Sequence, residues 1–310
     1  MTIRKKIDIP GSSQEAKMEK LKYLFLILRP RHWIKNLFIF TPLIFGKKLF
    51  SPPSTLKAIT AYCLFSLLSS SVYLINDLID IEQDRLHQIK RLRPIPSGKV
   101  SKKQAQITAA ILGLVSIALS FMLDIYFGWI AVIYFVFNLL YSKIFKKVVV
   151  IDVFCLAMFF LLRVIAGTVI TKAKFSYWMI LIVTLLSLFL GFNKRRQELR
   201  LLGIKSYAHR HVLSKYSLYY IDWMISVTTF LIAVIYMLYT VDTRTVAAFG
   251  TRDLFYSIPF VYYGIFRYLY LIHKVNRFGD PTDILLSDRM LQLNIILWIS
   301  VCVYVIYFRL

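Results

Sequence analysis

The amino-acid sequence predicts an all-α fold, a multi-pass membrane bundle of about nine transmembrane helices, from three observations. Apolar residues make up 58% of the 310 residues and charged residues only 18%, whereas an ordinary soluble domain has about half and about a quarter. The apolar residues fall into runs of about 20, the length at which a helix crosses a bilayer. Charged residues collect between these runs. A soluble two-domain chain is therefore excluded.

The N-terminal segment, residues 1–20, is polar and basic and lacks the short apolar stretch of a cleavable signal. We expect a flexible tail there and a single transmembrane helical domain over residues 21–310. The predicted spans are 22–46, 56–80, 104–123, 126–142, 148–171, 176–193, 216–241, 254–273 and 288–308.

The first predicted span contains Lys35 and Asn36 among apolar residues. A charge at the middle of a membrane helix costs about 2.5–3.5 kcal/mol on insertion scales. Lys35 therefore either extends to the membrane interface or faces a polar cavity that holds a phosphate. Both interpretations fit the sequence.

Basic residues are divided unequally between the two sides of the predicted bundle. The side that carries the N-terminus and the long loops 81–103, 193–215 and 273–289 holds 29 of the 39 Lys and Arg residues, and the opposite side holds eight. Because basic loops tend to stay in the cytoplasm, we expect the N-terminus and these loops on the cytoplasmic side of the cell (inner) membrane. The same bias accounts for the net charge of +23. It favours acidic phospholipids as partners and not nucleic acid.

An acidic motif runs from the end of the second predicted span into the long loop that follows. Asn76, Asp77, Asp80 and Asp84 form the pattern N-D-x-x-D-x-x-x-D. On a helix, aspartates at this spacing lie on one face, where they repel each other unless cations neutralise them. Oxygen ligands of this kind suit Mg²⁺, which takes further ligands from substrate phosphates. The motif therefore predicts a magnesium–diphosphate site, with a solvated helix end as the alternative.

Basic and aromatic residues near the same membrane face are candidates for phosphate binding. They are Lys90 in the first long loop, Tyr141 and Lys146 at the end of the fourth span, and Lys194 and Arg195 after the sixth, with the acidic Glu198 among the last group. Arginine and lysine suit phosphate in bidentate and point-charge modes. A patch for lipid headgroups is the plain alternative.

Three further charges lie inside predicted spans. Asp152 and Arg163 are about three helical turns apart on nearly the same face of the fifth span, and Arg267 lies in the eighth. Buried charges in membranes usually pair with one another or bind a ligand. A structural pair with other helices and a substrate role are both open for Arg163, and extension to the interface competes with function for Arg267.

At these residues the chain resembles the UbiA superfamily of intramembrane prenyltransferases. The resemblance rests on the nine spans, the acidic motif followed by R-P-I-P-S-G, and a second polar loop after the sixth span. Within the superfamily, the sequences LRPRHWIKN, YSKIFKKVVVIDVFCLAMFFLLRVIAG and NKRRQEL are most similar to the decaprenyl-phosphate phosphoribosyltransferases. Typical members carry a second aspartate motif in the second loop, where this chain has Lys194, Arg195 and Glu198.

The resemblance implies a transferase that uses 5-phosphoribosyl 1-diphosphate (PRPP) as donor and a polyprenyl (decaprenyl) phosphate as acceptor, for cell-envelope polysaccharide precursors. It implies that Asp77, Asp80 and Asp84, with Asn76, hold Mg²⁺ against the donor diphosphate. It also implies that the basic candidates above bind the phosphates, with Arg163, Glu198 and Arg267 as secondary candidates.

Two other functions fit parts of the sequence. An aromatic prenyltransferase that uses a polyprenyl diphosphate would share the first motif but should need the second acidic one. A transporter would explain buried charges but gives no role to the three aspartates beside a basic loop. A homo-oligomer is compatible with all of these functions.

Overall fold

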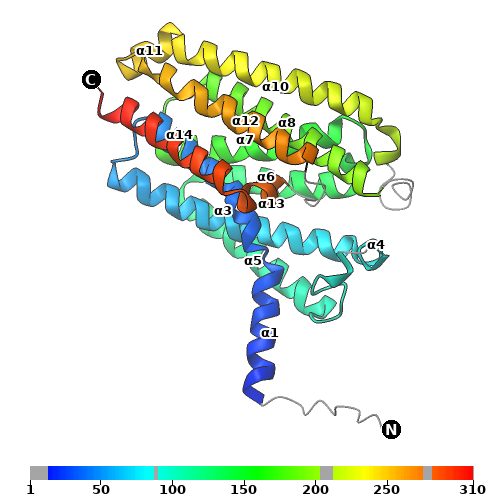
Figure 1. Ribbon diagram of the computed structural model, residues 1–310. Helices are drawn as coiled ribbons and strands as arrows, with labels where there is room; N and C mark the ends of the chain where they lie inside the picture. Colours follow the sequence, from blue (N-terminus) through cyan, green and yellow to red (C-terminus); the bar gives the residue numbers. More distant parts are fainter. Residues whose placement is uncertain (1–12, 87–89, 203–211, 275–280, 310) are drawn as a thin grey trace, which may run out of the picture.

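The computed structural model describes residues 13–86, 90–202, 212–274 and 281–309. Within these residues the regular elements are α-helices and 3-10 helices, with no strand. Figure 1 shows the long helices side by side in one bundle, from which the N-terminal helix α1 projects. The predicted all-α fold is confirmed.

Seven of the described helices are long and apolar enough to cross a membrane. These spans are Pro52–Ile79, Lys102–Leu123, Ile125–Lys147, Ile151–Thr171, Tyr177–Arg200, Leu218–Val241 and Arg289–Tyr307. They correspond to α3 (Pro52–Ile79), α5 (Lys102–Leu123), α6 (Ile125–Lys143), α7 (Ile151–Thr171), α8 (Tyr177–Leu202), α10 (Leu218–Val241) and α14 (Arg289–Tyr307). The chain is a multi-pass membrane protein, but the predicted count of nine spans is not confirmed.

The first predicted span, 22–46, is not one continuous helix. Helix α1 (Ser13–Ile27) ends before Arg29, which has a left-handed backbone (φ 54°), and the chain continues as the 3-10 helix η1 (Pro30–Phe40) and the short helix α2 (Thr41–Phe45). The cause is Pro30, because a residue before proline is displaced from the helical region. Such breaks need new hydrogen-bond partners inside a membrane. The Ser70 hydroxyl of α3 supplies one by donating to the Leu28 carbonyl (2.7 Å).

The eighth predicted span, 254–273, is also divided. It consists of the 3-10 helix η6 (Asp253–Ser257) followed by the 17-residue helix α12 (Ile258–Lys274). The remaining short elements connect the bundle at its two ends. They are α4 (Ile81–Leu86), η2 (Lys90–Leu92), η3 (Phe145–Lys147), η5 (Leu213–Lys215), α11 (Thr243–Phe249) and α13 (Pro281–Ser287).

Helix α7 is the centre of the packing. It contacts α3, α6, η1 and α2 on one side and α8 on the other, while α8 packs against α10. Gly167 allows η1 to approach α7 closely, since a Cβ atom there would lie 2.1 Å from the Ile39 carbonyl oxygen. The broken N-terminal segment is therefore fixed against the centre of the bundle, and its start lies near the end of α3, which carries the acidic motif.

Candidate active site

The acidic motif lies where α3 ends. The helix stops at Ile79, Asp80 is its C-terminal cap, and Asp84 belongs to the next helix, α4. Hydrogen bonds from Asp80 N to Asn76 O (3.0 Å) and from Asp84 N to Asp80 O (2.8 Å) keep the turns in register. The aspartates are therefore close in space, but they point to two different sets of partners.

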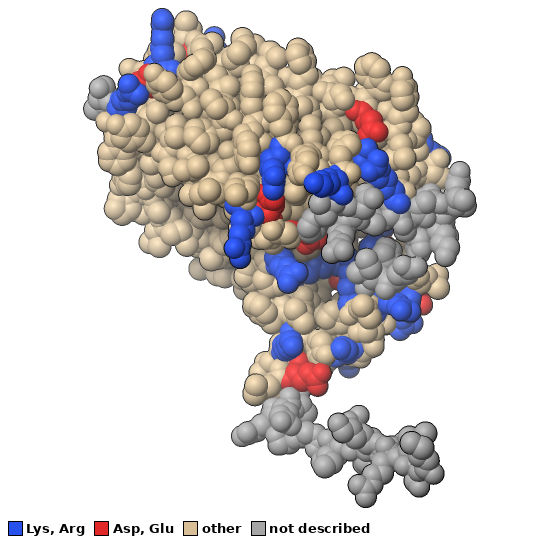
Figure 2. Space-filling model, viewed as in Figure 1, with Lys and Arg blue, Asp and Glu red and all other residues tan. Residues whose placement is uncertain are grey.

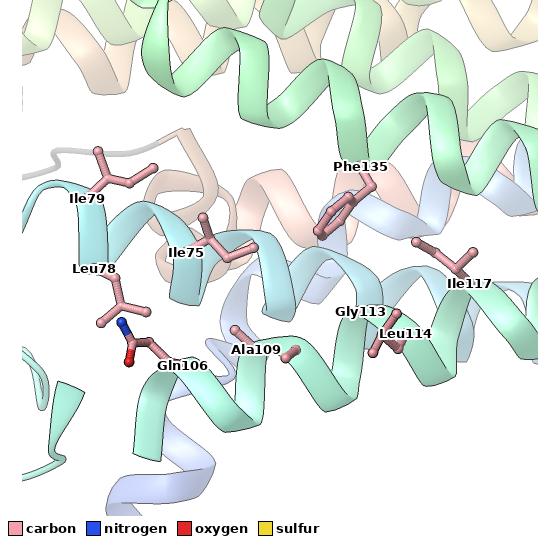
Figure 3. Close-up of a pocket in the computed structure, with 10 residues that line it drawn as sticks. Ile75, Leu78, Ile79, Gln106, Ala109, Gly113, Leu114, Ile117 and Phe135 are labelled. Carbon is pink, nitrogen blue, oxygen red and sulfur yellow. The ribbon is translucent and has the colours of Figure 1, made fainter. Parts of the chain in front are cut away.

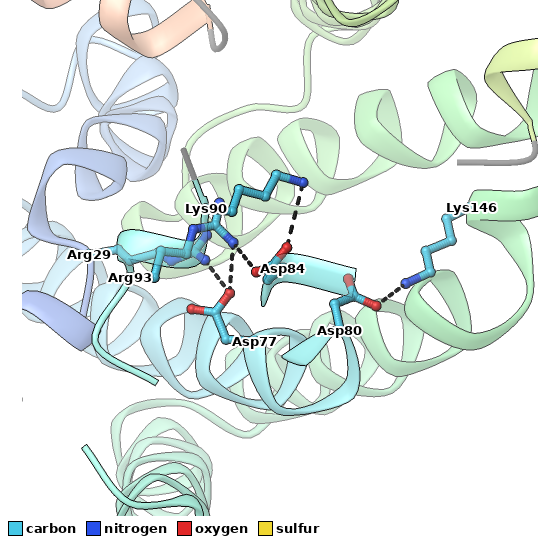
Figure 4. A network of polar contacts seen from close by, with 7 residues as sticks. All are labelled: Arg29, Asp77, Asp80, Asp84, Lys90, Arg93 and Lys146. Carbon is cyan, nitrogen blue, oxygen red and sulfur yellow. Dashed lines mark hydrogen bonds and ion pairs between the residues drawn. The ribbon is translucent and has the colours of Figure 1, made fainter. Parts of the chain in front are cut away.

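Asp77 and Asp84 share one guanidinium group. Arg93 Nη1 lies 3.0 Å from Asp77 Oδ1 and 2.7 Å from Asp84 Oδ2, and Arg29 also pairs with Asp77 Oδ1 (Figure 4). Both aspartates are buried, with 5% and 3% of their surface exposed. A carboxylate removed from water needs an opposite charge and hydrogen bonds to be stable. Arg29 and Arg93 supply both.

Lysines from two other segments complete this acidic cluster, by which we mean Asp77, Asp80 and Asp84. Lys146 Nζ donates to Asp80 Oδ1 (2.8 Å) from η3, and Lys90 Nζ lies 3.8 Å from Asp84 Oδ1 (Figure 4). Loss of hydration lowers the pKa of Lys90 from its ordinary value, although the charge of Asp84 opposes the shift. Two predicted phosphate ligands, Lys90 and Lys146, are thus placed beside the predicted metal ligands.

Asn76, the fourth residue of the motif, contacts the end of α6. The Ser142 hydroxyl donates to Asn76 Oδ1 and also reaches the Asn138 carbonyl (2.9 Å). Tyr141, adjacent to Ser142, packs edge-on against the Phe159 ring at 5.6 Å between centroids. The end of α6 therefore lies against the start of the acidic motif, as the predicted role of Tyr141 requires.

Arg195 is the centre of a second buried constellation. Arg195 and Asp152 have no exposed surface, and Arg195 Nε lies 2.9 Å from Asp152 Oδ2. Arg195 Nη1 also pairs with Glu198, and Tyr216 OH donates to Asp152 Oδ1 (2.8 Å). Burial and the neighbouring Asp152 charge raise the pKa of Tyr216 above its usual range. These contacts join α7, α8 and the segment before α10.

The acidic cluster and the residues that pair with Arg195 are linked through the charge of Lys90. The charges of Glu198 and Lys194 on α8 both act on Lys90, which itself pairs with Asp84. Most charged side chains visible in Figure 2 lie toward the end of the bundle that carries α4, and a smaller group lies at the opposite end. Lys90 of the first polar loop thus responds to the charges of Lys194 and Glu198 of the second, and their shared role in binding substrate stays a prediction.

Arg163 takes part in a different network. Its guanidinium donates to Asn36 Oδ1 (2.6 Å), the Phe159 carbonyl (2.6 Å) and Tyr134 OH (2.9 Å), and the side chain is 3% exposed. These contacts link Arg163 to other helices, and its substrate role stays a prediction. Lys35 lies on η1 beside Asn36 and is half-buried.

Arg267 pairs with the N-terminal cap of α14. Its Nη2 lies 2.8 Å from Asp288 Oδ2, and its Nε lies 3.2 Å from Asp288 Oδ1. Asp288 Oδ1 also accepts from Leu291 N (2.8 Å). The pair therefore links α12 to the start of α14, and none of its contacts involves the acidic cluster.

Sequence reasoning missed Arg29, Arg93, Asp152 and Tyr216 as site residues. One signal for the two arginines is their position, since each directly precedes a proline where a helix cannot continue. Where a helix ends at the membrane face, an arginine side chain can reach a buried carboxylate on a neighbouring helix. Tyr216 has no comparable signal, because its partner lies 64 residues away.

The donor set of the acidic cluster suits Mg²⁺. Carboxylate oxygens are the ligands that this hard cation prefers, and neither Asp77 Oδ2 nor Asp80 Oδ2 has a hydrogen bond or ion pair in the described structure. In the described residues no three acidic, His or Cys side chains converge on one point. Arg29, Arg93, Lys90 and Lys146 instead neutralise the carboxylates.

An apolar groove of about 670 Å³ lies between α3, α5 and α6, and no charged side chain is among its lining residues. Ile75, Ile79, Gly113 and Phe135 are among its lining residues, and Gln106 is the polar one (Figure 3). Its chemistry is that of a surface facing lipid chains. It contributes no charged group to the site.

A membrane bundle with buried carboxylates and basic side chains gathered from several helices has the architecture of an intramembrane transferase. The chain belongs to the UbiA prenyltransferase family, whose model matches residues 37–281. The expected family is therefore confirmed, and the protein is an enzyme of the prenyl- or phosphoribosyltransferase kind.

Curated relatives and a solved structure extend this result. The chain is 33% identical over 277 residues to a decaprenyl-phosphate phosphoribosyltransferase of Mycobacterium tuberculosis, covering 88% of this chain and 90% of the relative. It is 31% identical over 294 residues to the protein of the same name from Mycolicibacterium smegmatis, covering 92% of each. A UbiA homolog from Archaeoglobus fulgidus, solved with GPP and Mg²⁺, superposes with a TM-score of 0.68 at 19% identity, covering 92% of this chain and 99% of that one. The last likeness shows the shared fold.

Proposed function

We propose that the protein transfers the 5-phosphoribosyl group of PRPP to a polyprenyl phosphate and releases pyrophosphate. The observation that carries this proposal is the buried guanidinium of Arg195, whose Nη2 has no hydrogen-bond partner among the described residues. A guanidinium there suits a second phosphate-bearing substrate better than a second metal ion. The name of the two mycobacterial relatives supports the same transferred group and the same kind of lipid acceptor.

The acidic cluster would hold the donor diphosphate through a metal ion. In this proposal Asp77, Asp80 and Asp84, with Asn76, are the ligands of Mg²⁺, which when bound offsets the negative charge that develops on the leaving group. Arg29, Arg93, Lys90 and Lys146 now neutralise the same carboxylates. When the cation and diphosphate enter, these side chains are positioned to turn from carboxylate to phosphate oxygens, so the total charge stays balanced.

The chemical step then needs no general base. The bond between ribose C1 and the diphosphate oxygen breaks with its electron pair on the leaving oxygen, and an oxygen of the lipid phosphate forms the new bond to C1. Phosphate monoesters are largely doubly ionised at pH 7 because their second pKa is about 6. In this proposal Lys194, Arg195 and Tyr141 bind a phosphate of the donor or of the lipid acceptor.

The proposal also includes the orientation of the site. The acidic cluster and the end of α8 belong to the loops richest in Lys and Arg, which favours the cytoplasmic side of the cell membrane. PRPP is a charged, water-soluble substrate that would reach the site from that side. The product would serve as a lipid-linked sugar precursor for the cell envelope, and acidic phospholipids would surround the basic loops.

A mass measurement of the lipid product tests this function. Purified protein is incubated with Mg²⁺, labelled PRPP and polyprenyl phosphates of several lengths, and the lipid fraction is analysed. We expect a lipid heavier by one phosphoribosyl unit, and pyrophosphate release only when the lipid is present. Prenylation of hydroxybenzoate from geranylgeranyl diphosphate, with no reaction of PRPP, would instead identify an aromatic prenyltransferase.

A further inference from the structure

We propose that Asp152 and Tyr216 are positioning residues that hold Arg195 toward a substrate phosphate. This inference rests on the proposed function, since it deepens the role of the same site. The phosphate is that of either the ribosyl donor or the lipid acceptor. Neither residue would touch substrate.

The first argument is the burial of the ion pair. The Arg195 and Asp152 side chains are both 0% exposed, although each carries a charge. Burying two charges costs several kcal/mol per ion, which their attraction offsets only with good geometry and further hydrogen bonds. An apolar pair would join α7 and α8 with less cost. The retained charges therefore need a reason beyond packing.

The second argument is that the Arg195 guanidinium is not fully satisfied. Its Nη1 pairs with Glu198 and its Nε approaches Asp152, yet its buried Nη2 has no hydrogen-bond partner in the described structure. A buried donor without an acceptor costs about 1–3 kcal/mol. A purely structural arginine would use this group, whereas an arginine prepared for a phosphate would leave it available.

The third argument is the anchor of Asp152. Tyr216 OH donates to Asp152 Oδ1 (2.8 Å) and accepts from Val150 N (2.6 Å), at the point where α7 begins. Val150 has a φ of 68°, a conformation that a β-branched residue rarely adopts. Strained residues of this kind persist where the surroundings fix them, often at functional sites. A continuous chain of contacts thus runs from the Val150 backbone through Tyr216 and Asp152 to Arg195.

The position of the pair completes the argument. Glu198, which also binds Arg195, acts electrostatically on Lys90, and Lys90 pairs with Asp84. Arg195 is therefore held at the border of the acidic cluster. Removing Asp152 or Tyr216 should misplace Arg195 without removing any phosphate ligand.

The test uses two conservative variants of the full-length protein in detergent or nanodiscs. Tyr216→Phe deletes one hydroxyl, and Asp152→Asn keeps the shape while removing the charge. We expect each to raise the KM for PRPP or for the polyprenyl phosphate roughly tenfold, the loss expected for one charge-assisted contact, with a smaller change in kcat. Titrating each substrate at saturating levels of the other shows which phosphate Arg195 binds.

A double-mutant cycle separates positioning from a general structural effect. In an Arg195→Lys background, Tyr216→Phe should add little further loss, because the group that it positions has already been changed. The matched control is Asp222→Asn, since Asp222 pairs with the neighbouring Arg196 and is 45% exposed. This control should keep both KM values within about twofold, because it removes the charge of a half-exposed carboxylate that does not contact Arg195.

Three outcomes would overturn the inference in an active enzyme: unchanged KM values in both variants, losses that are additive with Arg195→Lys, or equal losses in Asp222→Asn. If the wild type does not turn over PRPP, the proposed function fails separately. The inference is then decided by thermal-shift titration with pyrophosphate and with polyprenyl phosphate. Weaker binding of either ligand by Tyr216→Phe supports it, and equal binding of both refutes it.

Discussion

Arg93 shows how single residues define this site. One of its nitrogens lies within 3.0 Å of two buried carboxylates, Asp77 and Asp84, which come from different helices. With Arg29, Lys90 and Lys146 it places positive charge beside each of three aspartates at a membrane face. The same cations are suited to bind a diphosphate once a metal ion neutralises the carboxylates.

Asparagine substitutions test the metal ligands. We expect Asp77→Asn, Asp80→Asn and Asp84→Asn each to abolish turnover with the fold retained, because each removes one anionic ligand and leaves diphosphate charge uncompensated. Activity is measured at limiting Mg²⁺. The control is Glu82→Gln, whose side chain is 70% exposed on the same helix as Asp84. Near-normal activity in all three aspartate variants would show that these aspartates do not bind the metal ion.

Substitution of Arg93 tests whether Mg²⁺ can replace the positive charge of this arginine beside the carboxylates. Arg93→Gln leaves two buried carboxylates short of a partner, which we expect to cost about 1–3 kcal/mol of stability. Mg²⁺ should restore much of this loss, because it supplies the missing positive charge and stabilises the folded state that binds it. Melting temperatures with and without Mg²⁺ measure the effect. A deficit that Mg²⁺ leaves unchanged would show that the cation does not bind between these carboxylates.

Among the helices, the broken segment between α1 and α2 has the largest consequence for the site. A continuous helix would carry Arg29 and Asn36 along one straight axis, but the left-handed residue before Pro30 turns the chain. The turn lets Arg29 reach Asp77 and lets Asn36 accept from Arg163 on α7. Close packing of η1 on α7 then fixes both contacts.

Gly167 gives a direct test of this packing. A methyl group at Gly167 would lie 2.1 Å from the Ile39 carbonyl oxygen, so Gly167→Ala should move η1 away and cost about 1–3 kcal/mol. Because η1 also positions Arg29, activity should fall together with the melting temperature. In the control Gly113→Ala, the added methyl meets side chains and no backbone atom, with the Ser71 hydroxyl at 3.0 Å and the Phe135 ring at 3.4 Å. An equal or smaller loss in Gly167→Ala would contradict the close approach.

For the bundle as a whole, the distribution of charge predicts its orientation. Ser97 lies in the loop after the acidic motif and Thr243 at the opposite end of the bundle, and both are exposed. In a Cys63→Ala background, which removes the exposed native thiol, we expect Ser97→Cys to resist an impermeant thiol reagent in intact cells. Thr243→Cys should be labelled. The reverse pattern would place the site outside the cell.

The sequence by itself determined the fold class, the family and the position of the acidic motif. Long apolar runs and the spacing of Asn76, Asp77, Asp80 and Asp84 are local properties, readable over a few helical turns. Lys90, Lys146, Lys194, Arg195 and Glu198 were also predicted from the sequence, because they lie in the polar segments that directly adjoin the spans.

Only the tertiary structure decided how these residues are paired and how the spans are divided. Arg29 reaches an aspartate 48 residues away, and Tyr216 reaches one 64 residues away. No pattern in the sequence reveals either of these pairings. The tertiary structure also showed that Arg163 binds Asn36 and Tyr134, and that two of the nine predicted spans are interrupted. The physical reason is that a charge or a broken helix inside a membrane must find its partner wherever the packed bundle presents one.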